Sequence, residues 1–193
     1  MQIFKDLADP QLHALLRDGA IGVLPTDTIY GLVCSAHNKA AVEKLYIIKP
    51  RELKPGTIVA ASDEQLRDLG IADRHLQKVS NYWPNPLSVV LPVDPSLKYL
   101  HLGRDSLAVR IPAHKPFRKL LEQTGSLLTT SANLPDQPPA RSLREAQAYF
   151  GDSLDFYVDG GAVDNAAAST IARLENDVLR ILRPGAYTLQ DEE

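Results

Sequence analysis

Apolar runs with the composition of β-strands lead into polar segments instead of ordinary turns, and this arrangement most constrains the fold. Residues 25–32 (PTDTIYGL) and 129–133 (TTSAN) follow such runs, and residues 49–54 (KPRELK) follow a helical run. The three segments supply cations, hydroxyls and an amide, which are the groups that hold a polyanion and a small polar molecule. The sequence therefore predicts that these segments meet in one cleft of an enzyme that uses a nucleotide.

The remaining pattern predicts a mixed sheet. Helical spacing and capping residues predict helices over residues 10–17, 39–48, about 115–123 and 146–150, with another after Ser62. Apolar and β-branched runs predict strands over residues 20–24, 57–61, 87–91, 107–111, 127–130, 156–158, 170–174 and 178–182. Helices separate the early strands, whereas the late strands follow one another closely. We therefore expect an α/β (α+β) fold, with parallel and antiparallel strands flanked by helices.

Length and composition favour one globular domain. The chain has 193 residues, of which 44% are hydrophobic and 23% charged, so it can bury a substantial core. We expect a single domain over residues 1–193, with a core from about 8 to 187 and a frayed acidic tail over 190–193. The single cysteine, Cys34, excludes an internal disulfide, and no apolar run is long enough to cross a bilayer. A cytoplasmic protein without membrane contact is the expectation.

Charge gives no reason to expect general nucleic-acid binding and directs attention to local clusters of cations. The net charge is −3, so any anion site must be local. Lys49, Arg51 and Lys54 lie together in a loop, although such a run taken alone is more often a solvated charged turn. Arg110 and Arg183 end apolar runs, where a guanidinium is costly unless it faces a ligand or pairs with an acid. Either role, ligand contact or internal salt bridge, is open for both arginines.

Hydroxyl and amide side chains complete the candidate cleft. Side-chain alternation along a strand places Thr129, Ser131 and Asn133 on one side, and the same alternation brings Thr26 and Thr28 together. An ordinary strand end followed by a turn is the alternative, because Ser and Asn bond readily to nearby backbone.

Familiar nucleotide and metal motifs are absent from the sequence. It contains neither G-x-x-x-x-G-K-[ST] nor a G-x-G-x-x-G that follows a strand. Cys34 and His37 have the spacing of metal ligands but lack two further ligands, so we expect a packed thiol, a surface imidazole and no metal site.

Seven ordered segments resemble one family. They are residues 25–32, the Lys49-x-Arg51 pair, and residues 83–88, 107–112, 129–133, 169–171 and 182–185. With these motifs in order from about residue 8 to 187, the chain resembles the YrdC-type L-threonylcarbamoyladenylate synthases in their single-domain bacterial form. The resemblance implies a twisted mixed sheet that forms a concave, positively charged cleft.

The resemblance also implies a reaction and its participants. L-threonine, bicarbonate and ATP would give threonylcarbamoyl-AMP and pyrophosphate, the first step toward N6-threonylcarbamoyladenosine at position 37 of tRNA. Mg²⁺ would be bound through the nucleotide, and a downstream threonylcarbamoyl-transferase complex and tRNA would be the partners.

The family pattern assigns roles to individual residues. Four residues would take part in catalysis: Lys49, Arg51, Ser131 and Asn133. Four would contact threonine: Thr28, Arg110, Ser131 and Arg183. The nucleotide would be lined by Lys49, Arg51, Ser106, Thr129, Asn133, Pro139 and Ser169, where Ser106 and Pro139 match the family by spacing.

The chain departs from the family pattern in one loop, and two other functions remain open. Glu52 stands where the family usually has proline, and residues 56–57 are Gly-Thr where it has proline-leucine or glycine-leucine. A paralogous family member that acts on another carbamoyl or acyl-adenylate substrate is one alternative. An RNA-binding module without catalysis is the other, although the negative net charge weighs against it.

Overall fold

The computed structural model describes residues 1–50, 54–163, 167–175 and 178–188, and these residues form one ten-stranded mixed sheet. The strand order is β1-β8-β2-β3-β7-β4-β6-β5-β9-β10. In chain order, the strands are β1 (Gln2–Phe4), β2 (Gly22–Pro25), β3 (Tyr30–Ser35), β4 (Thr57–Val59), β5 (Leu87–Pro92), β6 (Ser106–Arg110), β7 (Leu127–Ser131), β8 (Phe156–Val158), β9 (Thr170–Glu175) and β10 (Val178–Arg183). Parallel pairs (β1 with β8, β2 with β8, β4 with β6, β5 with β9) are mixed with antiparallel ones, as the sequence predicts.

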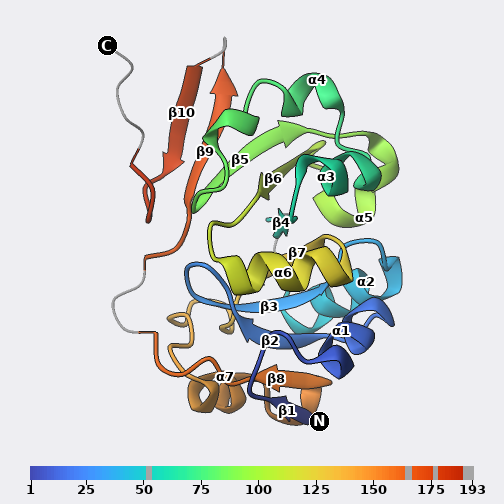
Figure 1. Cartoon of the computed structure of the whole chain (residues 1–193), viewed down its shortest axis with the longest axis vertical. Helices are drawn as coiled ribbons and strands as arrows, with labels where there is room; N and C mark the ends of the chain where they lie inside the picture. The colour runs from blue at the N-terminus through green and yellow to red at the C-terminus, as the bar shows by residue number, and fades with distance from the viewer. Residues whose placement is uncertain (51–53, 164–166, 176–177, 189–193) are drawn as a thin grey trace.

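Helices flank the sheet on both faces (Figure 1). They are α1 (Pro10–Arg17), α2 (Lys39–Ile48), α3 (Asp63–Leu69), α4 (Asp73–Leu76), α5 (Lys98–His101), α6 (Lys115–Thr124) and α7 (Leu143–Phe150), with short 3₁₀ turns at Ser80–Tyr82, Pro95–Leu97 and Gly151–Ser153.

Side-chain caps fix the helix starts, and α7 begins three residues before the predicted range 146–150. Asn38 accepts a hydrogen bond from the Ala41 amide at the start of α2, and Ser62 and Ser142 cap α3 and α7 in the same way. At its other end α2 stops before Pro50, which cannot continue a helix.

Two apolar clusters cover the two faces of the sheet. Adjacent strand residues alternate between them: Ile58 and Leu128 belong to the larger cluster, whereas Val59 and Leu127 belong to the smaller one. The smaller cluster is closed by the apolar sides of α1 and α6 (Leu12, Leu16, Phe117, Leu120, Leu121). Figure 1 shows α6 lying across the part of the sheet near β3 and β7, so β5, β9 and β10 extend beyond it.

Two strands and two short helices escape sequence prediction. β3 is buried along its full length, yet Gly31, Cys34 and Ser35 dilute its β-type composition, and its first three residues belong to the polar segment 25–32. β1 has three residues, too few for a periodic signal. The helices α4 and α5 have four residues each, which is likewise too few for a periodic signal.

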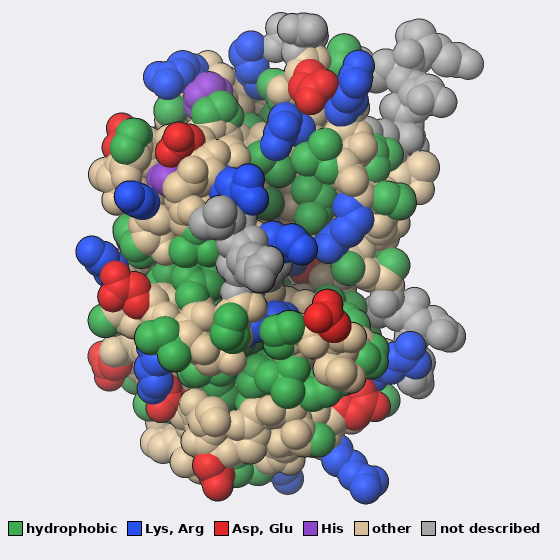
Figure 2. All heavy atoms as spheres, turned by 180° about the vertical axis from the view of Figure 1, so that it is seen from behind, with side chains coloured by type: hydrophobic (Ala, Val, Ile, Leu, Met, Phe, Trp, Pro, Cys, Tyr) green, Lys and Arg blue, Asp and Glu red, His purple; other side chains and the backbone are tan. Residues whose placement is uncertain are grey.

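Charge is distributed unevenly over the surface. Lys and Arg side chains gather around the middle of the face seen in Figure 2, although the chain as a whole carries a net charge of −3. Among the described residues, the structure contains no helix that is long and apolar enough to span a bilayer.

Candidate functional site

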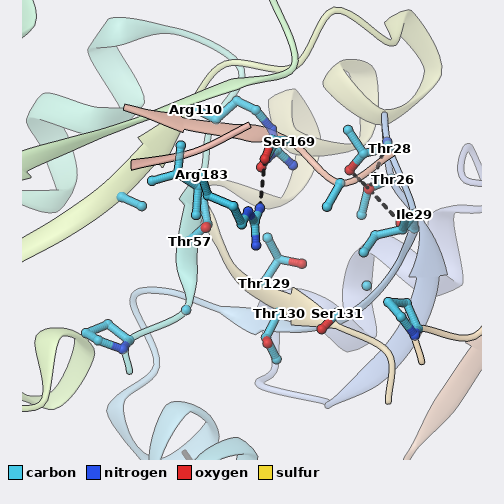
Figure 3. Close-up of a pocket in the computed structure, with 17 residues that line it drawn as sticks. Thr26, Thr28, Ile29, Thr57, Arg110, Thr129, Thr130, Ser131, Ser169 and Arg183 are labelled. Atoms are coloured by element: carbon cyan, nitrogen blue, oxygen red, sulfur yellow. Dashed lines mark hydrogen bonds between the residues drawn. The ribbon is translucent and has the colours of Figure 1, made fainter. Parts of the chain in front are cut away.

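One polar pocket lies where the ends of several strands meet. It has a volume of about 200 Å³ and opens between the β2–β3 connection, the ends of β6, β7 and β10, and the starts of β4 and β9 (Figure 3). Its lining includes most of the residues singled out from the sequence, and the members used below are Thr26, Thr28, Gly31, Thr57, Arg110, Thr129, Thr130, Ser131, Pro139, Ser169 and Arg183.

The pocket continues the sheet face that α1 and α6 cover elsewhere. Thr57 pairs with Ala108 on one side and with Thr129 on the other, so these three side chains lie next to one another on one face. Two residues along the same strands, Val59 and Leu127 point to the same face, where they pack beneath α1 and α6. The change from apolar to hydroxyl side chains along one face therefore marks the point where helix packing ends and the pocket begins.

Arg110 occupies the pocket wall and is also ion-paired. Its side chain is 4% exposed, and Nη2 donates to Oδ1 of Asp27 at 2.9 Å. Nη1 donates to the hydroxyl of Ser88 at 3.0 Å, and Nε has no hydrogen-bond partner among the described residues. The salt-bridge alternative is thus correct for Arg110, and the ligand alternative remains open, because the same side chain lines the pocket.

Arg183 enters the pocket from the end of β10. Its Nη2 donates to the backbone oxygen of Ser169 at 2.7 Å, and among the described residues it forms no salt bridge with an acid. Partial burial, and secondly the positive charge of Arg110, lower the pKa of the Arg183 guanidinium below its usual value. Two mutually repelling guanidinium groups that share one pocket favour an anionic ligand (Figure 3).

Lys49 is buried and binds the end of β7 and the turn that follows it. The residue is only 5% exposed, and Nζ donates to the backbone oxygen of Ser131 and to Oδ1 of Asn133, each at 2.6 Å. The Ser131 hydroxyl also donates to Oδ1 of Asn133 at 2.6 Å. Lys49, Ser131 and Asn133 therefore form one connected group, of which Ser131 lines the pocket.

The predicted alternation of side chains holds up to the strand end. Thr26 and Thr28 are brought together as expected, with their hydroxyl oxygens 3.2 Å apart. Thr129 and Ser131 both line the pocket, as does Thr130 between them, whereas Asn133 lies outside its lining. β7 ends at Ser131 and the chain turns there, since the Asn133 amide bonds to the Ser131 carbonyl at 3.0 Å, so strand alternation no longer applies.

Three further sequence candidates have different positions. Pro139 and Ser169 line the pocket. Ser106 begins β6 and lies on the same strand face as Ala108 and Arg110, but beyond the pocket lining. Arg51, together with the atypical Glu52, lies outside the described residues.

Two residues of the site, Asp27 and Ser88, are not predicted by sequence reasoning. The Asp27 side chain is 3% exposed and holds Arg110, while Ser88 is fully buried between Arg110 and Ser169. Each stands inside a segment that the sequence highlights, 25–32 and 83–88, so the available signal was a polar residue inside an ordered motif.

Cys34 and His37 have the structural roles expected of them. Cys34 is completely buried, and burial raises the pKa of its thiol to about 12. His37 is exposed, and its Nε2 bonds to the Ser126 hydroxyl at 3.1 Å.

Comparison with known proteins identifies the family. The family model Sua5_yciO_yrdC, described as "Telomere recombination", matches residues 14–185. The chain is 38% identical over 178 residues to the threonylcarbamoyl-AMP synthase of Idiomarina loihiensis, which covers 87% of this chain and 94% of that protein. It is also 38% identical over 154 residues to the threonylcarbamoyl-AMP synthase of Klebsiella pneumoniae, and this match covers 76% of this chain and 80% of that protein.

Solved structures agree with the sequence relatives. P. abyssi Sua5 complexed with L-threonine superimposes with a TM-score of 0.83 at 29% identity over 96% of this chain, which spans 58% of that longer protein. E. coli YciO shares the fold, with a TM-score of 0.78 at 22% identity and 95% coverage of both chains. The predicted mixed α/β fold and the predicted family are confirmed. The positively charged cleft remains a prediction. The chain belongs to the Sua5/YciO/YrdC family.

Proposed function

We propose that this protein is a threonylcarbamoyl-AMP synthase that converts L-threonine, bicarbonate and ATP into threonylcarbamoyl-AMP and pyrophosphate. The observation that carries the proposal is the pairing of Arg110 and Arg183 in one hydroxyl-rich pocket. It is supported by relatives named threonylcarbamoyl-AMP synthase and by a structural neighbour that is complexed with L-threonine.

Charge compensation is the main chemical task of such a site. The threonine amine and bicarbonate yield a carbamate with release of water, and a carbamate oxygen then attacks the α-phosphorus of ATP, which expels pyrophosphate. Carbamate is already a nucleophile, so the reaction needs no strong protein base. Both reactants are anions, and they approach each other only when cations offset their repulsion. Among the described residues, the pocket lining contains guanidinium and hydroxyl groups and no carboxylate, in agreement with this requirement.

The proposed roles follow the positions of the side chains. Thr28, Ser131, Arg110 and Arg183 would contact threonine, with a guanidinium holding its carboxylate. The nucleotide would lie along Thr129, Pro139 and Ser169, toward Ser106 and Arg51. Because Nζ of Lys49 already contacts Ser131 and Asn133, Lys49 would act on the substrates partly by fixing those two residues.

Mg²⁺ would enter with the nucleotide. The described part of the pocket lining has no Asp or Glu, and Asp27 is engaged by Arg110, so the described residues offer no set of hard carboxylate ligands here. The phosphates would therefore supply most of the ion's ligands, and the ion would neutralise charge on them.

The chemistry of the product indicates its partner. A carbamoyl group joined to AMP is a mixed anhydride that water cleaves readily, so a transferase must accept the threonylcarbamoyl group soon after release. We propose a threonylcarbamoyl-transferase complex as that partner, with tRNA as the final acceptor, in the cytoplasm.

The product itself tests the proposal. The purified protein is incubated with ATP, ¹³C-bicarbonate and L-threonine, and the reaction is followed by mass spectrometry. The proposal predicts a threonylcarbamoyl-AMP that carries the label and equimolar pyrophosphate. Serine and valine serve as matched substrates, because serine keeps the hydroxyl and valine keeps only the shape. Absence of labelled product with threonine would overturn the function, and equal use of valine would overturn a pocket that reads the hydroxyl.

A further inference from the structure

Ser88 is a buried hydroxyl that connects two residues of the pocket without lining it. It lies on β5, is 0% exposed, and faces the side of the sheet opposite to its neighbours Leu87 and Val89, which pack in the larger apolar cluster. Its Oγ accepts from Arg110 Nη1 at 3.0 Å and donates to Ser169 Oγ at 3.1 Å. Ser169 lines the pocket, whereas Ser88 stands behind it.

The direction of these hydrogen bonds follows from the chemistry of the groups. A guanidinium has only donors, so Ser88 Oγ must accept from Arg110. The single proton of Ser88 is then available for Ser169, whose Oγ accepts it. Ser169 therefore keeps its own hydroxyl proton for another acceptor. No protein acceptor for that proton is recorded among the described residues.

A second contact restrains Ser169 from the other side. Its backbone oxygen accepts from Nη2 of Arg183 at 2.7 Å, so both pocket arginines connect to this serine, one directly and one through Ser88. Asp27 holds the other end of the Arg110 guanidinium at 2.9 Å. The hydroxyl of Ser169 is thus the free end of a fixed series, Asp27–Arg110–Ser88–Ser169.

We propose that Ser88 is a positioning residue that fixes the Ser169 hydroxyl as a donor toward an anionic oxygen of a bound substrate. The inference rests on the proposed function for the identity of that substrate. Carboxylate and phosphate oxygens share the required chemistry, because both only accept hydrogen bonds at neutral pH, and both are favoured by the neighbouring guanidinium groups. The oxygen therefore belongs either to the amino-acid carboxylate or to the nucleotide phosphates.

Binding measurements on variants test the series and separate the two sources. Calorimetric titrations with L-threonine, with L-threoninamide and with ATP are compared for the wild type, Ser88→Ala, Ser169→Ala and the double variant. Ser88→Ala is expected to weaken the ligand whose anionic oxygen meets Ser169 about 10-fold or more, and the other ligand little. If that oxygen belongs to the carboxylate, the variant binds threonine more weakly and binds threoninamide as the wild type does. If it belongs to the phosphates, only ATP binding weakens.

Coupling between the two serines is the readout that a merely structural role would not produce. If Ser88 acts through Ser169, the double variant binds no more weakly than Ser169→Ala alone. Ser126→Ala is the matched control, since Ser126 is also 0% exposed and its hydroxyl bonds to His37, and neither residue belongs to the pocket lining. Ser88→Cys, with a similar volume and a weak donor, gives the same test if Ser88→Ala is too unstable to titrate.

The outcomes distinguish this inference from the proposed function. Wild-type binding of all ligands by Ser88→Ala, or losses from the two serines that simply add, would overturn the positioning role even if the wild type makes the product. If the wild type makes no threonylcarbamoyl-AMP, yet the serine variants show the coupled loss of anion binding, the function would be overturned and the positioning role retained. A wild type that binds neither threonine nor ATP would overturn both.

Discussion

At the residue scale, the ion pair between Asp27 and Arg110 shows how the pocket keeps a buried cation. Both side chains are almost fully buried, at 3% and 4% exposure, and their closest atoms are 2.9 Å apart. Replacing Asp27 by asparagine keeps the shape and removes the counter-charge, so a buried guanidinium is left unpaired. We expect Asp27→Asn to lower the free energy of unfolding by about 3 to 5 kcal/mol, measured by urea denaturation.

An exposed ion pair supplies the control for that prediction. Arg180 and Glu175 form a pair on the surface of the β9–β10 hairpin, with the arginine side chain 76% exposed. Glu175→Gln should change the free energy of unfolding by no more than about 1 kcal/mol, because solvent screens exposed pairs. Equal stability of Asp27→Asn and the wild type would contradict the importance given to the buried pair.

Arg183 is expected to matter for activity more than for stability. It lines the pocket, but it lies on an exposed part of β10 and pairs with no acid among the described residues. Arg183→Gln should lower the rate of pyrophosphate release roughly 100-fold, by analogy with the removal of one oxyanion donor, with little change in melting temperature. Arg180→Gln, on the same strand, is the matched control and should retain wild-type rates. Similar rates for the two variants would exclude a role for Arg183 in the pocket.

The sequence predicts the residue types of the site better than their partners. Arg110 and Arg183 end apolar strands, and burial cost alone indicates that each needs a partner or a ligand. That the partner of Arg110 is Asp27, from a segment 83 residues away, depends on sheet order, which local patterns do not contain. The bridging position of Ser88 depends on the same order, because β5 and β9 become neighbours only in the folded sheet.

At the element scale, the end of β10 is fixed to the start of β9 by close backbone packing. A Cβ on Gly185 would lie 2.2 Å from the backbone oxygen of Ala168 and 2.5 Å from the carbonyl carbon of Ser169, so only glycine fits there. The Ala186 amide also bonds to that oxygen of Ala168 at 2.9 Å. We expect Gly185→Ala to separate these segments, to move Arg183 away from Ser169 and to weaken anion binding.

Thermal melting and calorimetric binding of L-threonine check this prediction. Thr188→Ala, three residues further along and exposed, is the control and should behave as the wild type in both measurements. Normal binding by Gly185→Ala would show that the strand ends accept a Cβ without moving the arginine.

The strands and helices themselves could mostly be predicted from the sequence. Caps at Asn38, Ser62 and Ser142 and periodic leucines determine helix positions locally. β3 could not be predicted in this way, because it is stabilised by pairing with β2 and β7 on its two sides and by complete burial, and not by its own composition.

At the scale of the whole molecule, buried acids make the fold sensitive to alkaline pH. Burial raises the pKa of Cys34 from its ordinary 9.0 to about 12 and that of Tyr157 from 10.0 to about 12. In the unfolded chain these groups lose their protons at lower pH, so the unfolded state binds fewer protons and stability falls as pH rises above the unfolded pKa values. Between pH 9 and 10, where the thiol titrates first, the loss approaches about 1.4 kcal/mol per pH unit.

A variant without the thiol isolates its contribution. Cys34→Ala should be less stable at neutral pH because it leaves a small cavity, yet its stability should fall less steeply between pH 9 and 10. Urea denaturation at several pH values provides the slopes. Parallel curves for Cys34→Ala and the wild type would show that the thiol is not protected by burial.

The central claim is that one pocket of a mildly acidic molecule brings together two anionic reactants, of which one is derived from threonine. Pyrophosphate release from ATP and bicarbonate, measured with each of the twenty amino acids in turn, tests it most directly. We predict release that depends on the amino acid, with L-threonine giving the highest rate by a wide margin. Release that is independent of the amino acid, or highest with an amino acid lacking a hydroxyl, would contradict the account.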